Sequence, residues 1–261
     1  MNLNTLKFRL NDGVARITLS RPDDANAINL TMAQELLKTI ITCDVDSSVR
    51  AVLLDAEGRL FSAGGDLGHF AKAGETLPAV LKELTATLHA AISHLAHMRA
   101  PVIASVQGAA AGAGFSLACA CDLVLAAKSA KFTLAYTKAG LVPDGSSTYF
   151  LPRLLGRRKA LEMMLLNPVL TAEEAHQLGL VNRVIHDDDL ITESLNLAAK
   201  LGAGPTNAYA ATKRLLLASS HETLESQMAL EASAIAEIAA DSDGQEGIAA
   251  FLEKRQPHFQ G

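Results

Sequence analysis

The spacing of hydrophobic positions changes along the chain, and each change predicts a different element. Alternating residues on either side of Asn11-Asp-Gly13 predict a β-hairpin over residues 8–19. Continuous apolar runs predict buried strands over 51–54, 102–106 and 123–126. Hydrophobic residues at helical spacing predict helices over 31–43, 77–98 and 115–120.

The second half of the chain is dominated by helical spacing. Helices are predicted over 157–166, 171–178, 189–202, 205–218 and 221–254, with one late strand over 181–185. A short extended piece is predicted at 131–134, and the loop 141–148 leads into a helix that ends at Leu155. The glycine-containing segment 68–75 is predicted to be a mobile loop. Strands that alternate with helices and then give way to helices alone indicate an α/β core with a helical tail.

Composition narrows the class of protein. The net charge of the 261-residue chain is −5 and it has no basic tract, which argues against nucleic-acid binding. No apolar run reaches the roughly 18 residues of a membrane span, and the N-terminus lacks the hydrophobic region of a signal peptide, so we expect a cytoplasmic protein. Cys119-Ala-Cys121 has the wrong spacing and too few ligands for a metal site, and no metal is expected. No Walker or Rossmann fingerprint occurs.

Two glycine-rich turns each follow a predicted strand. One is Gly108-Ala-Ala-Ala-Gly-Ala-Gly114, and the other is Phe61-Ser-Ala-Gly-Gly-Asp-Leu67. A glycine turn at a helix N-terminus leaves backbone N–H groups without partners inside the helix, and the helix dipole there favours negative charge. Two such turns can direct two amides at one carbonyl oxygen, which is the geometry of an oxyanion hole. Close helix–strand packing also selects glycine and alanine, so a purely structural role stays open.

Together these segments resemble the enoyl-CoA hydratase/isomerase (crotonase) superfamily, and the similarity extends from Ser20-Arg-Pro22 to the closing 251–259 stretch. The resemblance implies an α/β fold in which ββα units form a spiral core over residues 1–200. It implies that a helical region over 201–261 makes trimer contacts, giving a homotrimer or a dimer of trimers. It also implies an acyl-CoA thioester substrate, with coenzyme A as part of that substrate and no tightly bound cofactor. No nucleic-acid or membrane partner is expected.

The resemblance also assigns roles to single residues. In the family, the thioester oxygen accepts two backbone N–H bonds, and by position match these come from Ala63 and Ala113. Position 113 is usually glycine in hydratases, and alanine is acceptable there if its φ stays negative. Backbone contacts to the CoA adenine are implied for Ala25 and Ala27. The rest of the substrate groove is implied to include Gly64, Gly65, Asp66, Leu67, Ser116 and Tyr136.

The acid–base residues depart from the hydratase pattern. The positions of the two hydratase glutamates hold Ser116 and Tyr136, and neither is a general base near pH 7 without help. A carboxylate occurs nearby in Leu141-Val-Pro-Asp-Gly145, where Asp144 could simply cap the helix that follows. The surrounding 132–153 segment, however, is similar to the phenylacetate-pathway ring-epoxide/oxepin-CoA isomerases, in which the aspartate after proline moves the proton. That branch often has Gly-Gly where this chain has Ser146-Ser147.

These residues favour an acyl-CoA isomerase that shifts a double bond by a 1,3-proton transfer through a thioester enolate, with Asp144 as the acid and base. One alternative is other crotonase chemistry, such as enoyl-CoA hydration or decarboxylation, in which Tyr136 takes part. An alternative of another class is a non-catalytic acyl-CoA-binding protein that keeps the fold. The sequence does not identify the acyl group.

Overall fold

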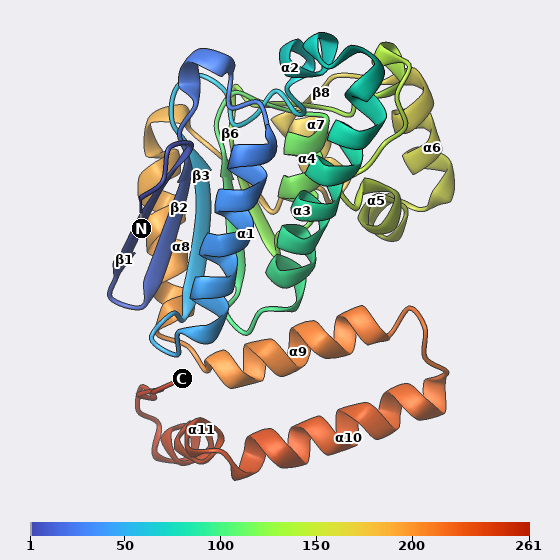
Figure 1. Cartoon of the computed structure of the whole chain (residues 1–261). Helices are drawn as coiled ribbons and strands as arrows, with labels where there is room; N and C mark the ends of the chain where they lie inside the picture. The colour runs from blue at the N-terminus through green and yellow to red at the C-terminus, as the bar shows by residue number, and fades with distance from the viewer. Residues whose placement is uncertain (1) are drawn as a thin grey trace.

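A six-stranded sheet forms the centre of the computed structural model, which describes residues 2–261 (Figure 1). The strand order is β1-β2-β3-β4-β6-β9, with bounds Leu6–Asn11, Val14–Leu19, Ala51–Ala56, Val102–Val106, Leu123–Ala127 and Arg183–Ile185. Strands β1 and β2 form the predicted antiparallel hairpin, and the turn residues Asp12 and Gly13 both have positive φ, as a tight hairpin requires. All other neighbouring strands in this sheet run parallel.

A second, three-stranded sheet brings the two glycine turns together. It consists of β5 (Ala109–Ala111), β7 (Lys131–Thr133) and β8 (Leu170–Thr171). Neither β5 nor β8 was predicted, because three small residues and two residues are too short to show a period. A single bridge pairs Ser62 with Ala110, so the 61–67 segment lies against the turn that leads into α4 (Ala113–Cys119).

Helices cover both faces of the large sheet (Figure 1). Helices α1 (Leu30–Val45) and α3 (Leu77–His97) pack against each other in front of it, and α8 (Leu190–Gly202) packs behind it. The prediction of a loop over 68–75 is wrong, because most of this segment forms the short helix α2 (Leu67–Lys72). The Asp66 side chain caps α2 by accepting a hydrogen bond from the His69 N–H at 3.0 Å.

The core is built mainly from aliphatic residues around α4. All seven residues of α4 are buried, and its Phe115 ring packs on Phe132 with 5.4 Å between the ring centroids. The remaining helices of the upper body are α5 (Ser147–Leu155), α6 (Arg157–Leu166) and α7 (Ala172–Gln177). Helix α4 therefore lies where the sheets meet, and its first residue opens onto the site described below.

The last three helices form a separate layer beneath the upper body (Figure 1). They are α9 (Thr206–Ala218), α10 (Leu224–Ala240) and α11 (Ser242–Glu253). The single helix predicted over 221–254 is wrong, because the chain leaves the helical conformation at Asp241, whose side chain accepts a hydrogen bond from the Ser242 N–H. In residues 2–261, no helix is both long enough and apolar enough to cross a membrane.

Candidate active site

An apolar cavity of about 290 Å³ lies between the two glycine turns, α3 and the segment that precedes α5. Its walls include Ile28, Phe70, Leu81, Leu84, Leu88, Leu134 and Leu141. Among the described residues that line it, Asp144 is the one carboxylate. A charged group beside an otherwise hydrophobic cavity is a frequent mark of a catalytic site.

The two glycine turns approach each other closely beside this cavity. A Cβ atom on Gly64, which has a φ of +96°, would lie 2.8 Å from the carbonyl oxygen of Ala111. A Cβ atom on Gly114 would lie 2.5 Å from the Cβ of Ser62. Both distances are shorter than van der Waals contact, so the turns can meet at this separation only because these residues have no side chain.

The Ala113 N–H is available to a ligand. Ala113 is the first residue of α4, so its amide has no carbonyl partner inside the helix, and it lines the cavity. Its φ is not positive, which confirms that alanine fits this position without strain. The preceding residue, Gly112, has a φ of +50° and turns the chain into the helix.

The second expected donor needs a correction. The Ala63 N–H donates a hydrogen bond to the Ala25 carbonyl oxygen at 3.0 Å, so this amide is already paired. Gly65 lines the same cavity, and its N–H makes no hydrogen bond within the described residues. Position matching alone could not detect this, because whether an amide is free depends on where the Ala25 loop lies.

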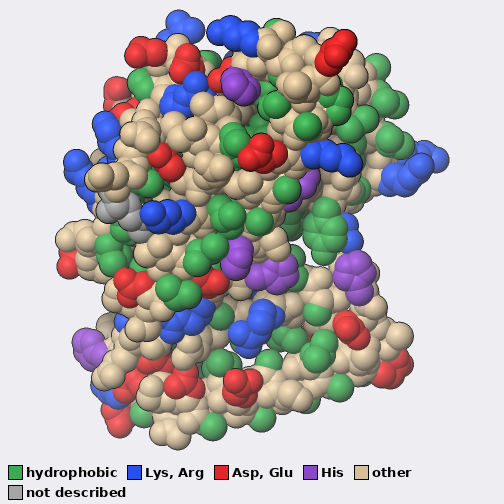
Figure 2. Space-filling model, in the orientation of Figure 1, with side chains coloured by type: hydrophobic (Ala, Val, Ile, Leu, Met, Phe, Trp, Pro, Cys, Tyr) green, Lys and Arg blue, Asp and Glu red, His purple; other side chains and the backbone are tan. Residues whose placement is uncertain are grey.

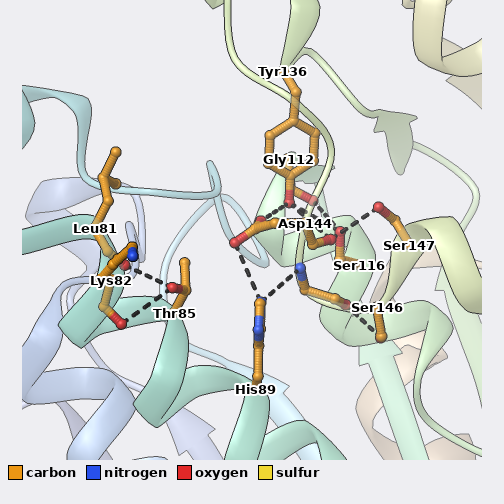
Figure 3. A network of polar contacts seen from close by, with 11 residues as sticks. Leu81, Lys82, Thr85, His89, Gly112, Ser116, Tyr136, Asp144, Ser146 and Ser147 are labelled. Atoms are coloured by element: carbon orange, nitrogen blue, oxygen red, sulfur yellow. Dashed lines mark hydrogen bonds and ion pairs between the residues drawn. The ribbon is translucent and has the colours of Figure 1, made fainter. Parts of the chain in front are cut away.

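Two side chains lie beside the Asp144 carboxylate at the edge of the cavity (Figure 3). One carboxylate oxygen, Oδ1, accepts a hydrogen bond from the Tyr136 hydroxyl at 2.7 Å. The other, Oδ2, lies 3.5 Å from His89 Nε2. The helix-cap interpretation is wrong, because α5 begins at Ser147 and the Asp144 side chain makes no hydrogen bond to its amides. The carboxylate is therefore directed to the cavity, not to the helix.

Tyr136 acts as a hydrogen-bond donor in this network. Burial, together with the negative charge of Asp144, raises the pKa of the Tyr136 hydroxyl, so it stays protonated. Its oxygen lies 3.0 Å from the buried Ser116 hydroxyl. The Ser116 hydroxyl also lies 3.2 Å from the Gly112 carbonyl oxygen, so its single proton is directed either to that oxygen or to Tyr136. The arrangement contradicts a role for Tyr136 as the base.

Sequence reasoning missed His89, which lies on α3. Its Nε2 accepts a hydrogen bond from the Gly145 N–H at 3.3 Å, so the neutral imidazole carries its proton on Nδ1. A protonated imidazole would instead present an N–H to Asp144 across the 3.5 Å gap. No local motif surrounds His89 in the sequence, and only the packing of α3 against the 143–146 loop reveals its role.

Asp66 has a structural role. It caps α2 and lies 3.1 Å from the Arg21 guanidinium. Burial by itself would raise the pKa of Asp66, but the hydrogen bonds from the His69 N–H and from Arg21 outweigh it and lower the pKa. The carboxylate therefore stays ionised and paired. It does not line the cavity, whereas its neighbour Leu67 does.

The two residues expected to contact the CoA adenine lie outside the cavity, on the loop that follows β2. The Ala25 carbonyl accepts the Ala63 N–H, and the Ala27 carbonyl accepts a hydrogen bond from Arg21. The loop is therefore fixed by its own backbone contacts. In the described residues, no group of three or more His, Cys, Asp or Glu side chains is arranged to hold a metal ion.

Comparisons with known proteins show the family and the fold of the chain. The sequence profile of the family described as "Enoyl-CoA hydratase/isomerase" matches residues 9–261. A probable enoyl-CoA hydratase of Rhodobacter capsulatus is 41% identical over the full length of both chains. The 1,2-epoxyphenylacetyl-CoA isomerase of Escherichia coli is 37% identical over 95% of each chain. The crystal structure of an enoyl-CoA hydratase from Polaromonas superposes with a TM-score of 0.94 at 37% identity, covering 98% of this chain and 99% of that one.

Proposed function

Because the chain belongs to the enoyl-CoA hydratase/isomerase family and has its fold, we propose that it is an acyl-CoA isomerase that moves a double bond by a 1,3-proton transfer. The observation that carries this proposal is the position of Asp144. It is the one carboxylate among the described residues of a cavity that also contains the Ala113 and Gly65 amides. One group that both takes and returns a proton is sufficient for this reaction.

The proposed reaction starts with the thioester oxygen between the N–H groups of Gly65 and Ala113. Asp144 removes a proton from the carbon next to the carbonyl, and negative charge develops on that oxygen as an enolate. Two amides that are already in place stabilise this charge without reorganisation, and losing one such donor typically costs about 3 kcal/mol. Asp144 then returns the proton two carbons further along, and the double bond moves.

The neighbours of Asp144 support this role. Tyr136 donates to Oδ1 and fixes the direction of the carboxylate, while the apolar walls keep water away from the enolate. We propose that the CoA part of the substrate follows the loop of Ala25 and Ala27, past Gly64 and Leu67, to reach the cavity. The acyl-CoA is then the substrate, and coenzyme A is not a separate cofactor.

The test is to replace Asp144 with asparagine. The Asp144→Asn variant should lose at least about 10²-fold in the conversion of 3-enoyl-CoA to 2-enoyl-CoA, because an amide neither takes nor returns a proton at neutral pH. Calorimetry with a saturated acyl-CoA should give an affinity close to that of the wild type, since asparagine can still accept from Tyr136.

The matched control is Asp188→Asn, which changes a side chain that is 92% exposed and does not line the cavity. It should keep wild-type turnover. If Asp144→Asn retains more than about a tenth of wild-type turnover, well above the range for a lost acid–base group, the proton is moved by another residue and the proposal is wrong.

A second candidate is hydration of an enoyl-CoA, and the presence of His89 favours it. Water addition uses one group to activate water and another to protonate the α-carbon, and His89 with Asp144 forms such a pair at 3.5 Å. Mass spectrometry in D₂O separates the two reactions. Isomerisation exchanges deuterium into the acyl chain without adding water, whereas hydration adds the mass of one water molecule.

A further inference from the structure

A second cavity, of about 770 Å³, lies on the other side of Asp144. It is bounded by α3, the 143–146 loop, the start of α5 and α9. Among residues 2–261, Asp144 alone lines both cavities. An acyl chain whose reacting carbons lie beside Asp144 could therefore continue past the carboxylate into this second space.

The second cavity differs from the first in charge. Its lining contains Arg214 and three histidines, His89, His97 and His221, against the single acid Asp144. Figure 2 shows histidines and basic side chains gathered at the hollow between the upper body and the lower helical layer. The remaining wall is largely apolar, with Ile92, Ala96, Phe150, Leu217 and Ala218, and can cover methylene groups.

Arg214 on α9 is available to a ligand. Within residues 2–261 it makes neither an ion pair nor a hydrogen bond. Three acidic residues border an adjoining cavity beyond Arg214, and two of them have other partners. Asp44 lies 3.7 Å from His94. Asp241 accepts a hydrogen bond from Asn207 at 2.7 Å. The third, Glu237, makes no ion pair with Arg214. An exposed guanidinium without a carboxylate partner is suited to bind one from a ligand, through two parallel N–H donors.

Resting on the function proposed above, we propose that the second cavity receives the far end of the acyl chain, and that Arg214 selects acyl groups that end in a carboxylate. The terminal carboxylate forms an ion pair with Arg214, while the thioester end stays between Gly65 and Ala113.

The position of Arg214 also restricts the chain length. His97 and Arg214 both line the far part of the cavity, which adjoins the third space bordered by Asp44. His97 lies eight residues after His89 on α3, which places it about 12 Å further along the helix at about 1.5 Å per residue. The preferred acyl group is therefore one long enough to extend well beyond Asp144.

The experiment compares saturated CoA thioesters that bind without reacting. Adipoyl-, suberoyl- and sebacoyl-CoA, each with a free terminal carboxylate, are titrated by calorimetry beside hexanoyl-, octanoyl- and decanoyl-CoA of the same lengths. The wild type should bind the carboxylate member of at least one of the longer pairs about fivefold more tightly, the range expected for an exposed ion pair. Arg214→Gln should remove that preference and leave the alkyl thioesters unchanged.

The control variant is Arg158→Gln, which changes another exposed arginine that lines neither cavity, on α6. It should keep the preference. Equal affinity of the wild type for both members of every pair would overturn the inference, whatever the variants do. A loss of affinity for CoA itself in Arg214→Gln would overturn it too, because the cavity would then hold the CoA phosphates. Failure of every acyl-CoA to bind would instead refute the proposed function.

Discussion

Helices α4 and α10 are both rich in alanine and other small or apolar residues, yet their surroundings are opposite. Every residue of α4 is buried, while α10 buries none. The glycine turns, the second sheet and α5 enclose α4, whereas α10 packs mainly on α9 and α11. Small apolar residues therefore do not decide burial by themselves. The number of helices and strands packed around a helix decides whether it is buried. A single chain has too few of these elements to cover the C-terminal layer.

The uncovered residues of this layer are large. Ile235 is 72% exposed, Phe251 is 84% exposed and Leu252 is 75% exposed. Monomeric proteins rarely expose several such side chains together. We propose that the 201–261 region covers them through contacts between subunits, in a homotrimer or a dimer of trimers, with residues 1–200 as the core domain of each subunit.

The two regions should differ most in how much the free energy of unfolding falls when one phenylalanine in each is replaced by alanine. Phe115→Ala should lower the free energy of unfolding by about 3–5 kcal/mol, because it leaves a cavity beside Phe132 in the core. Phe251→Ala should change the unfolding of an isolated subunit by less than about 0.5 kcal/mol. Urea unfolding at several protein concentrations measures both.

The concentration dependence separates the two effects. The loss in Phe115→Ala should be the same at every protein concentration, whereas any loss in Phe251→Ala should vary with concentration, because it acts through subunit association. A concentration-independent loss of several kcal/mol in Phe251→Ala would show that the exposed ring belongs to the core of the subunit, and the comparison would fail.

A smaller effect on stability is expected from adding one methyl group. Gly114→Ala should cost about 1–3 kcal/mol, because the new Cβ meets Ser62 at 2.5 Å and forces the two glycine turns apart. Because those turns carry the Ala113 and Gly65 amides, turnover should fall by about 10²-fold or more as well. Thermal unfolding and the isomerisation assay report the two losses.

The matched change in the C-terminal layer is Gly247→Ala on α11, where the nearest atom to a new Cβ is 3.4 Å away. It should leave turnover unchanged and stabilise α11 slightly, by up to about 1 kcal/mol. Wild-type turnover in Gly114→Ala would mean that the separation of the turns does not control the oxyanion site.

The smallest effect on the fold is expected from charged substitutions on the lower layer. The double variant Ile235→Asp with Leu252→Asp should keep the circular-dichroism spectrum of the wild type, because both side chains are exposed in the subunit. Light scattering should show the wild type as a trimer or hexamer and the variant shifted toward monomer. A wild type that is monomeric at micromolar concentration would contradict the proposed assembly.

Local patterns predicted most of the fold. The inner strands β3, β4 and β6 of the large sheet were predicted from continuous apolar runs, and the hairpin strands β1 and β2 from alternating residues. Helices α3 and α6 match their predicted ranges almost residue for residue, because burial imposes a period on the sequence. Strands β5 and β8 were missed because they are too short to carry a period. The break between α10 and α11 was missed because the Asp241 side chain looks like any other polar residue within a helix.

The sequence by itself determined which residue types are present: the glycines that let the two turns meet, and a single carboxylate, Asp144, in the segment before α5. That Ser116 and Tyr136 take the places of the hydratase glutamates stays a prediction from the resemblance. Only the tertiary structure decided which groups are free to act. It pairs the Ala63 amide with Ala25 and leaves the Gly65 amide open, and it places His89 beside Asp144. The reason is physical. The residue type determines which hydrogen bonds and proton transfers a group can make. Whether the group is already hydrogen-bonded depends on partners from distant segments of the chain, which only folding brings together.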